Sequence, residues 1–368
     1  MNYSKKNPKV SVIIPVFNGD KYIERLLKSL LRQSFNDFEV ICVDNSSTDR
    51  TREIASAFCE NDPRFFCVTI EHGGAGVSRN KGLDLARGKY IIFLDVDDEY
   101  NKDLLKEMVS AAEKHQADEV FCLYHEYNYR THTRSSNHGF DQRTFPDNVP
   151  VRTADISNLY QHTSWRCTNT LFRKEIIDRY NLRYSETRVS EDVFFIKAYP
   201  LLTKKIVGVH KNLLTVRRFI DEQSLTSTRW RHTEEAVTVM LELYEWLNEN
   251  GLYEKYRETY LWYFFLNIRY NGGFPLNPNY VEALTDALCT CDIFSDMSEE
   301  EFYEKFWKDN DTELLIDMLR GMGENAAYTE ERAQHTSNLL LTILSVEERA
   351  KEKYGRTLNL KEGRVTTK

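Results

Sequence analysis

Long apolar runs are missing from this chain of 368 residues. The most apolar stretch, "LWYFFLNI" at residues 261–268, is far shorter than the ~18 residues that a membrane-spanning helix needs. The start, "MNYSKKNPKV", leads into a short strand-like segment and has neither the apolar core nor the small-residue cleavage site of a secretory signal. We therefore expect a cytoplasmic protein, and peripheral contact with the inner face of the membrane stays an open alternative.

An excess of positive charge is also missing. The chain has 49 Lys and Arg against 57 Asp and Glu, a formal net charge of −8. Because nucleic acids are bound by basic surfaces, this balance argues against them as partners. The seven cysteines are scattered, and no further Cys or His lies at ligand spacing beside Cys289 and Cys291. This count predicts reduced thiols and excludes a disulfide framework.

Internal repeats are absent too, and strands and helices alternate instead. Apolar, β-branched segments predict strands, and apolar residues at helical spacing between them predict helices. The predicted strands are 9–17, 38–44, 65–70 and 90–95, and the predicted helices are 20–33, 48–59 and 76–86. Such alternation indicates parallel βαβ units in a doubly wound sheet. Ligands of these sheets bind at the carboxyl ends of the strands.

The second half of the chain has a different texture. A helix at 102–116 and a strand at 119–127 precede a polar segment, 130–150, that we expect to be irregular. One more strand is predicted at 213–219, and helical patterns fill 231–350. We expect an α/β domain over residues 1–228 and a helical C-terminal domain over 229–368, with a frayed tail from residue 358.

Polar residues follow the first two predicted strands. In "PVFNGD", Pro15 cannot donate to a strand ladder, and Asn18 with Gly19 favours a turn. In "VDNSSTD", Ser47 or Thr48 can cap the next helix, which leaves Asp44 at the strand tip unexplained. A carboxylate there can accept the imide N–H of a uracil ring.

A glycine cluster, "EHGGAGVSRNKG", precedes the third helix. Three glycines in four positions, Gly73, Gly74 and Gly76, let backbone approach a ligand closely. On the helix itself, Arg79 and Asn80 can reach a diphosphate or a base. For Arg79 considered by itself, a solvated helix face is the alternative.

Three carboxylates, Asp95, Asp97 and Asp98, end the buried strand in "YIIFLDVDDEY". They repel one another unless a cation lies between them. Mg²⁺ or Mn²⁺ suits hard oxygen ligands and is commonly bound by one or two carboxylates together with substrate phosphates. The alternative, that Asp98 or Asn101 caps the next helix, leaves Asp95 unexplained.

Later segments add candidates whose local patterns have simpler explanations. In "RVSEDVFFIKAYP", Glu191 and Asp192 open an apolar helix with Ser190 as the expected N-cap. Trp165, in "TSWRCTN", either stacks on a sugar ring or packs in the core. Of the neighbours Arg217 and Arg218, at most one faces inward, because alternate strand residues share a face.

Taken in order across residues 9–225, these motifs resemble the family-2 inverting glycosyltransferases of bacterial polysaccharide biosynthesis. The matching segments are "VSVIIPVFN", "VICVDNSSTDRT", "GGAGVSRNKGLDLARGKYIIFLDVDD", "NTLFRKEII" and "SEDVFF". The resemblance implies the GT-A fold, a Rossmann-like α/β architecture with a mostly parallel sheet flanked by helices, here followed by an α-helical C-terminal domain. Asn45 and Ser46 stand where the family more usually has Asp and Gly.

The resemblance also implies roles for individual residues. Asp44 would bind the base, Asp95 would lie near the ribose, and Asp97 would hold the metal, Mn²⁺ or Mg²⁺, with Asp98 as a competing ligand. Asp192 would be the catalytic base, with Glu191 beside it. The full donor-binding set that we predict is Pro15, Phe17, Asn18, Asp44, Gly74, Arg79, Asn80 and Asp95.

The implied reaction transfers a sugar from a nucleotide diphosphate-sugar, UDP being favoured, to a hydroxyl of a saccharide or lipid-linked acceptor. A sugar-nucleotide nucleotidyltransferase is one alternative, but it needs a Gly-rich basic loop after the first strand, where this chain has "PVFNGD". A non-catalytic nucleotide-sugar-binding protein is another, although the set of Asp44, Asp95, Asp97 and Asp192 is intact. The helical domain has three open roles: shaping the acceptor site, forming a homodimer, or resting on the membrane.

Overall fold

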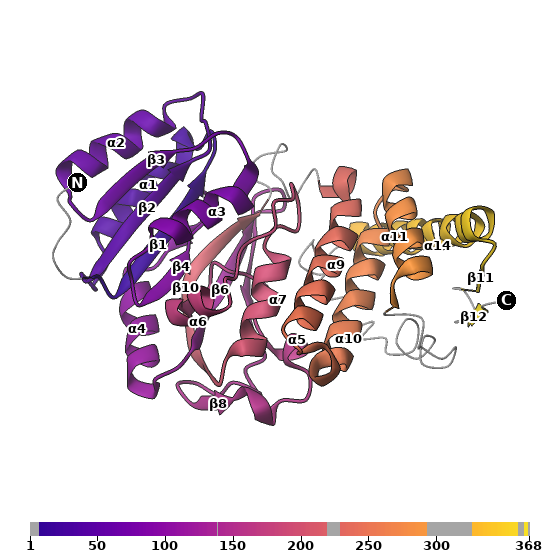
Figure 1. Ribbon diagram of the computed structural model, residues 1–368. Helices are drawn as coiled ribbons and strands as arrows, with labels where there is room; N and C mark the ends of the chain where they lie inside the picture. The colour runs from indigo at the N-terminus through magenta and orange to yellow at the C-terminus, as the bar shows by residue number, and fades with distance from the viewer. Residues whose placement is uncertain (1–6, 138, 219–228, 293–325, 360–363, 367–368) are drawn as a thin grey trace. The chain divides into compact units, whose positions relative to one another are not determined.

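Alternating strands and helices form the first of two units, Met1–Asp221 and Glu222–Lys368 (Figure 1). The computed structural model describes residues 7–137, 139–218, 229–292, 326–359 and 364–366. The first elements are β1 (Val10–Val16), α1 (Asp20–Leu31), β2 (Phe38–Asp44), α2 (Thr51–Asn61), β3 (Phe65–Thr69), α3 (Gly74–Leu85) and β4 (Tyr90–Phe93). Their four strands pair in parallel. The predicted βαβ series is therefore confirmed, with ends displaced by a few residues.

The sheet then continues with strands of both directions. The remaining elements of this unit are β5 (Glu99–Tyr100), α4 (Leu104–His115), β6 (Glu119–Asn128), β7 (Thr133–Asn137), β8 (Pro150–Arg152), η1 (Thr153–Asp155), α5 (Leu159–His162), β9 (Thr170–Arg173), α6 (Lys174–Arg179), α7 (Val193–Leu202) and β10 (Lys205–Arg218). The strand order is β3-β2-β1-β4-β9-β6-β10-β5, with β7 beside β6 and β8 beside β10. β9 runs antiparallel to both β4 and β6, so these two strands point the same way. Because β1, β2, β3, β4, β6 and β10 share one direction, the sheet is mostly parallel.

Two predictions about this part of the sheet are wrong in detail. The segment 130–150 is not wholly irregular, since it contains β7 and the start of β8. β7, "TRSSN", has no apolar residue because it pairs at the edge of the sheet with β6 alone, so no hydrophobic alternation marks it. The strand predicted at 213–219 is only the second half of β10.

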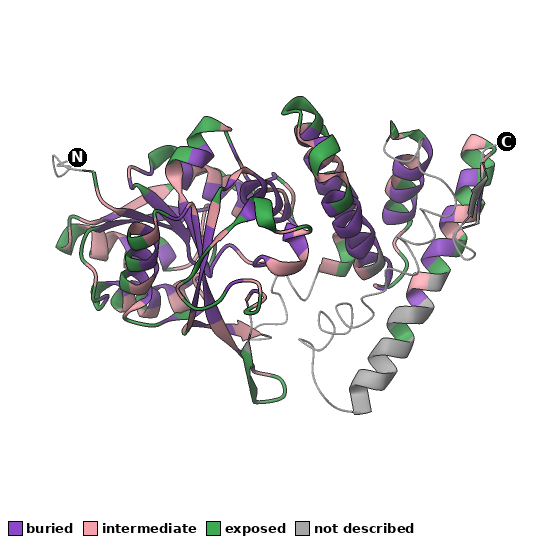
Figure 2. Ribbon diagram, turned by 90° about the horizontal axis from the view of Figure 1, so that it is seen from below, coloured by how far each residue is buried: buried purple, intermediate pink, exposed green. Residues whose placement is uncertain are grey.

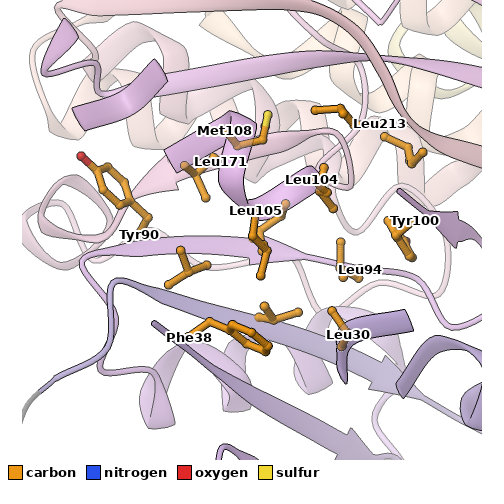
Figure 3. Close-up of a cluster of buried hydrophobic side chains, with 14 of the residues drawn as sticks. Leu30, Phe38, Tyr90, Leu94, Tyr100, Leu104, Leu105, Met108, Leu171 and Leu213 are labelled. Atoms are coloured by element: carbon orange, nitrogen blue, oxygen red, sulfur yellow. The ribbon is translucent and has the colours of Figure 1, made fainter. Parts of the chain in front are cut away.

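The core lies on both faces of the sheet. One face packs against α1, α2 and α4, with Leu30, Leu104, Leu105 and Met108 among the buried side chains (Figure 3). The other face is aromatic: Phe93 of β4 and Phe172 of β9 meet Phe195 of α7 at ring-centre distances of 5.7 and 5.3 Å. Burial on both faces explains why β1 and β2 read as continuous apolar runs.

The second unit is mostly helical where the structure describes it, as predicted, with one short strand pair near its end. Its elements are η2 (Arg229–His232), α9 (Glu234–Glu249), α10 (Tyr253–Gly272), α11 (Pro278–Thr290), α14 (Ala326–Tyr354), β11 (Thr357–Asn359) and β12 (Arg364–Thr366). Residues 261–268 lie in α10 and are buried, as the colouring of Figure 2 shows. No helix in the described ranges is long and apolar enough to span a membrane. The tail expected to fray contains β11 and β12, which pair antiparallel around buried Leu358.

Truncating the core of the first unit should cost stability. Leu104 is fully buried between α4 and the sheet, so Leu104→Ala should lower the free energy of unfolding by about 2–5 kcal/mol. Urea unfolding followed by circular dichroism measures this loss. Leu31→Ala is the control, because Leu31 is 43% exposed and its truncation should change stability by less than ~0.5 kcal/mol. Equal losses for the two variants would contradict the packing described.

Candidate active site

The carboxyl ends of β1, β2 and β4 lie at one edge of the sheet. Val16 and Asp44 are register partners, and the Asn45 N–H donates to the Val16 carbonyl at 2.8 Å. The Leu94 N–H donates to the Ile13 carbonyl at 3.0 Å. β1 runs one residue past Pro15, which is tolerated because beyond Ile13 it pairs with β2 alone. The loops that follow these strands, which carry most of the predicted site, therefore open from the same edge.

The loops after β1 and β2 are joined by side chain to backbone bonds. Asn18, at φ 48°, accepts from the Thr48 N–H at 2.8 Å, and its own N–H donates to the Ser47 hydroxyl at 2.9 Å. Ser47 and Thr48 therefore do not cap α2, and the prediction that one of them would is wrong. Asp49 serves that first turn by accepting from the Thr51 N–H at 2.9 Å, because the intervening turn delays the helix by three residues.

Asp44 lies at the base of this edge with 1% of its surface exposed. Its two oxygens accept from the Ser47 N–H at 3.1 Å and from the Thr69 hydroxyl at 3.2 Å. Ser46, in place of the family's glycine, adopts φ 62° and donates to the Ile70 carbonyl at 2.7 Å. That hydrogen bond anchors a serine in a conformation that glycine adopts more readily.

Two exposed rings border the same loops. Phe17, 48% exposed, lies with its ring centre 4.6 Å from that of His72. The Asn45 amide oxygen accepts from the Gly73 N–H at 2.8 Å, which ties the loop after β2 to the start of α3. An exposed aromatic pair next to a polar strand edge suits a planar heteroaromatic ligand.

The glycines of the third motif serve the packing of α3. Gly74 adopts φ 89°, in the left-handed region. A Cβ on Gly76 would lie 2.1 Å from the Ser185 carbonyl oxygen, so only glycine lets α3 approach that segment. Asn80 exchanges two hydrogen bonds with the Tyr184 backbone, at 2.9 and 2.8 Å. Donor contacts by Gly74 and Asn80 stay predictions, while Gly76 and Asn80 hold residues 184–191 against α3.

Arg79 joins two candidate motifs that are 96 residues apart in sequence, at Asp95 and Glu191. Its guanidinium, 6% exposed, donates from Nη2 to Asp95 at 3.0 Å and from Nη1 to Glu191 at 2.8 Å. The Tyr184 ring lies 5.2 Å from its Cζ. Burial raises the pKa of Glu191, and Asp192 raises it further, while Arg79 opposes both. The segment "RVSEDVFFIKAYP", which carries Glu191, therefore faces the strand edge.

Asp98 supports the end of β10. It is 3% exposed, and it accepts from the Arg217 N–H at 3.0 Å, with Arg166 3.8 Å from its other oxygen. Burial raises the pKa of Asp98, and Arg166 opposes that shift. Asp98 does not cap α4, whose N-cap is Asp103, so that alternative is wrong. Asn101 instead accepts from the Asp103 N–H at 2.9 Å.

Asp97 is the more accessible carboxylate of the pair. Its backbone carbonyl accepts from Arg25 at 2.8 Å and from Arg217 at 3.2 Å, while its side chain is only partly buried. Burial raises the pKa of Asp97, and the Asp95 carboxylate raises it further. In the described part of the chain, no three His, Cys, Asp or Glu side chains gather to hold a metal ion. One or two carboxylates completed by diphosphate oxygens would fit this arrangement.

Asp192 occupies the N-cap position of α7, partly exposed and with no capping bond from its side chain. Ser190, which we predicted as the N-cap, is at φ 60°, and its carbonyl accepts from the Val193 N–H at 3.0 Å. Burial raises the pKa of the Cys167 thiol, and the charges of Asp95 and Asp192 raise it further while Arg79 opposes them. The Asp192 carboxylate therefore makes no hydrogen bond that caps its own helix.

Several residues of the site were not predicted. Arg25 and Arg166 lie beside the Asp97–Asp98 turn, and Lys197 is buried on α7, five residues after Asp192. No local pattern marks any of them, because each reaches the site from a different element. Only Arg166 had an indication in the sequence, because it directly follows the candidate residue Trp165.

Part of the chain matches a known family model. Residues 11–180 match the model described as glycosyl transferase family 2. EpsJ of Bacillus subtilis, described as an uncharacterized glycosyltransferase, is 32% identical over 196 residues, which cover 50% of this chain and 54% of EpsJ. The chain thus spans about half the length of that relative. TarS of Staphylococcus aureus, a poly(ribitol-phosphate) beta-N-acetylglucosaminyltransferase, is 31% identical over 52% of this chain and 32% of its own.

Solved structures share the fold. Residues 1–349 of TarS, in complex with UDP-GlcNAc, superpose with a TM-score of 0.66 at 22% identity, over 98% of this chain and 96% of that one. The mannosyltransferase PcManGT of Pyrobaculum calidifontis, in complex with GDP-Man and Mn²⁺, gives a TM-score of 0.50 at 14% identity, over 94% and 88% of the two chains. The expected GT-A architecture is therefore confirmed.

Removing the Arg79 bridge should be costly. Arg79→Met leaves two carboxylates, Asp95 and Glu191, without their shared cation and should lower the free energy of unfolding by about 3–5 kcal/mol. The loss should shrink as pH falls, because protonated carboxyls no longer need the cation. Urea unfolding at pH 7.5 and pH 5 measures both effects. Arg50→Met, which breaks an exposed pair with Glu53, is the control and should leave the free energy of unfolding nearly unchanged.

Proposed function

Residues 11–180 belong to glycosyl transferase family 2, and from this premise we propose that the chain is an inverting glycosyltransferase. It moves a sugar from a nucleotide diphosphate-sugar to a hydroxyl of a saccharide or lipid-linked acceptor. The observation that carries this proposal is the Arg79 bridge, which joins Asp95 on the donor side to Glu191, the neighbour of Asp192. It brings a nucleotide edge and a candidate base into one site.

The proposed donor carries UDP. Asp44, Asn18 and Pro15 lie at the strand edge, and Phe17 with His72 supplies exposed rings for the base. Asp44 is the proposed acceptor for the uracil imide N–H, and Asp95 is proposed to bind the ribose. UDP-GlcNAc bound to TarS, a structure with the same fold, supports UDP over other nucleotides.

Asp97 is the proposed metal ligand, and the proposed metal is Mn²⁺ or Mg²⁺. The carboxylate of Asp97 is partly exposed and accepts no hydrogen bond from another described residue, whereas Asp98 is committed to Arg217. A divalent cation held there supplies positive charge to the leaving diphosphate. The Mn²⁺ in the PcManGT complex supports this choice.

Asp192 is the proposed general base. Its carboxylate accepts the proton of the acceptor hydroxyl as that oxygen bonds to the anomeric carbon, while the bond from the same carbon to the diphosphate breaks on the opposite face. Glu191 cannot share this role easily, because Arg79 engages it at 2.8 Å. Arg79 is buried and already donates to two carboxylates, which favours positioning them over direct contact with the diphosphate.

Other expectations stay proposals. They include a catalytic domain that ends near residue 228, a cytoplasmic location, and a part for residues 229–368 in acceptor binding, dimerisation or membrane contact. A direct test of the donor is a thermal-shift scan of nucleotide diphosphates and their sugars with Mn²⁺. A ligand at 100 times its Kd should stabilise the protein by ~2.7 kcal/mol. No shift with any UDP-sugar would overturn the proposed donor.

Replacing the base should stop turnover and spare donor binding. Asp192→Asn removes the proton acceptor and keeps the shape of the side chain, so kcat for UDP release from a UDP-sugar should fall by ~10²-fold or more. Its Kd for the donor, measured by calorimetry, should match that of the unsubstituted chain. Glu186→Gln, an exposed change in the same segment, is the control. Normal turnover by Asp192→Asn would sink the base assignment.

Replacing the metal ligand should instead weaken donor binding. Asp97→Ala should raise the Kd of a UDP-sugar in Mn²⁺ about tenfold, or ~1.4 kcal/mol, and have little effect when EDTA replaces the metal. Calorimetry in the two buffers measures this difference. Glu99→Ala is the matched control, because Glu99 is exposed in the same loop. Equal Kd values for Asp97→Ala and the unsubstituted chain in Mn²⁺ would exclude Asp97 as a ligand.

A further inference from the structure

A lysine is buried on the helix that begins at the proposed base. Lys197 lies on α7, five residues after Asp192, with no exposed surface. Its ammonium nitrogen is 4.0 Å from the centre of the Trp165 ring and 5.2 Å from that of Tyr160.

Charged groups face Lys197 from two elements. Asp192 lies at the start of its own helix, and Glu119, 3% exposed, lies on β6. Tyr160 of α5 and Trp165 of the following segment add their ring faces. Burial lowers the pKa of Lys197 to about 7, and the two carboxylates oppose that shift. Burial raises the pKa of Glu119, against the opposing charge of Lys197.

This position is expensive for a cation. A methionine of similar length would fill the space without desolvating a charge, and replacing buried charges with apolar residues is often neutral or stabilising. Packing therefore does not explain a lysine here. The Trp165 ring, 4.0 Å from the ammonium, and the negative charge of Asp192, which acts on Lys197 from the start of the same helix, indicate a role in the reaction.

We propose that Lys197 is a positioning residue whose ammonium holds the Asp192 carboxylate and the Trp165 ring in place on the acceptor side of the site. The inference rests on the proposed glycosyltransferase function. The ammonium attracts the carboxylate by its charge and the indole face by a cation–π contact. Both attractions end when Lys197 loses its proton, so the protonated form is the active one.

Two substitutions separate charge from packing. Lys197→Met keeps the volume and removes the charge, whereas Lys197→Arg keeps a charge at every accessible pH. The assay is UDP release from UDP-GlcNAc in Mn²⁺ with water as the acceptor, measured from pH 6 to pH 9. Lys28→Met, on the surface of α1, is the matched control.

The proposal expects a specific pattern. Lys197→Met should lower kcat at least tenfold with KM for UDP-GlcNAc within twofold, and it should lose the decline in kcat above about pH 7 that the unsubstituted chain shows. Lys197→Arg should retain more of the turnover than Lys197→Met and also lack that decline.

Stability gives the readout that excludes a merely structural role. The folded-state pKa of Lys197 lies below its unfolded value, so the unsubstituted chain binds fewer protons when folded and gains stability as pH rises above about 7. The Tm of Lys197→Met should thus equal or exceed that of the unsubstituted chain at pH 7, and its advantage should shrink by pH 9. A Tm that falls together with kcat would overturn the proposal.

The failures of the two proposals look different. If the unsubstituted chain releases UDP and Lys197→Met matches it in kcat and pH profile, the positioning role is wrong and the glycosyltransferase function stands. If the unsubstituted chain releases no UDP from UDP-GlcNAc or other UDP-sugars, the proposed function fails and takes this inference with it.

Discussion

One buried guanidinium links the two sides of the candidate site, the end of β4 and the start of α7. Arg79 donates to Asp95 beyond β4 and to Glu191 before α7, and its burial leaves little water to compete for either carboxylate. The contact depends on backbone details elsewhere, since α3 reaches residues 184–191 only because Gly76 has no side chain. The donor edge and the proposed base are thus placed together by a single ionic contact and the close approach of one helix.

The nucleotide edge shows how polar residues divide between structure and ligand. Ser47, Thr48 and Asn18 form hydrogen bonds that join the loops after β1 and β2. The Asp98 carboxylate accepts a hydrogen bond from the end of β10. Asp97, Asp192 and the exposed Phe17 ring make none of these bonds, and they are the groups proposed for the metal, the proton transfer and stacking on the nucleotide.

Several charged side chains are buried in the first unit. Lys197 on α7 and Glu119 on β6 are buried, and Arg166 lies beside buried Asp98. Each desolvated group costs stability unless opposite charge or a ring face compensates it. Such a concentration within one domain is more typical of a reacting site than of a core built for stability.

The sequence by itself determined the βαβ series, the strand-end carboxylates and the family, because each depends on local periodicity or on adjacent residues. It did not reveal β7 or antiparallel β9, whose pairing partners are distant in the chain, nor the wrongly assigned caps at Ser47, Ser190 and Asp98. Only the tertiary structure decided that Arg79 joins Asp95 to Glu191, that Asp98 supports β10, and that Lys197 is buried against the Trp165 ring. These facts depend on three-dimensional distances and burial between remote segments, which local pattern does not encode.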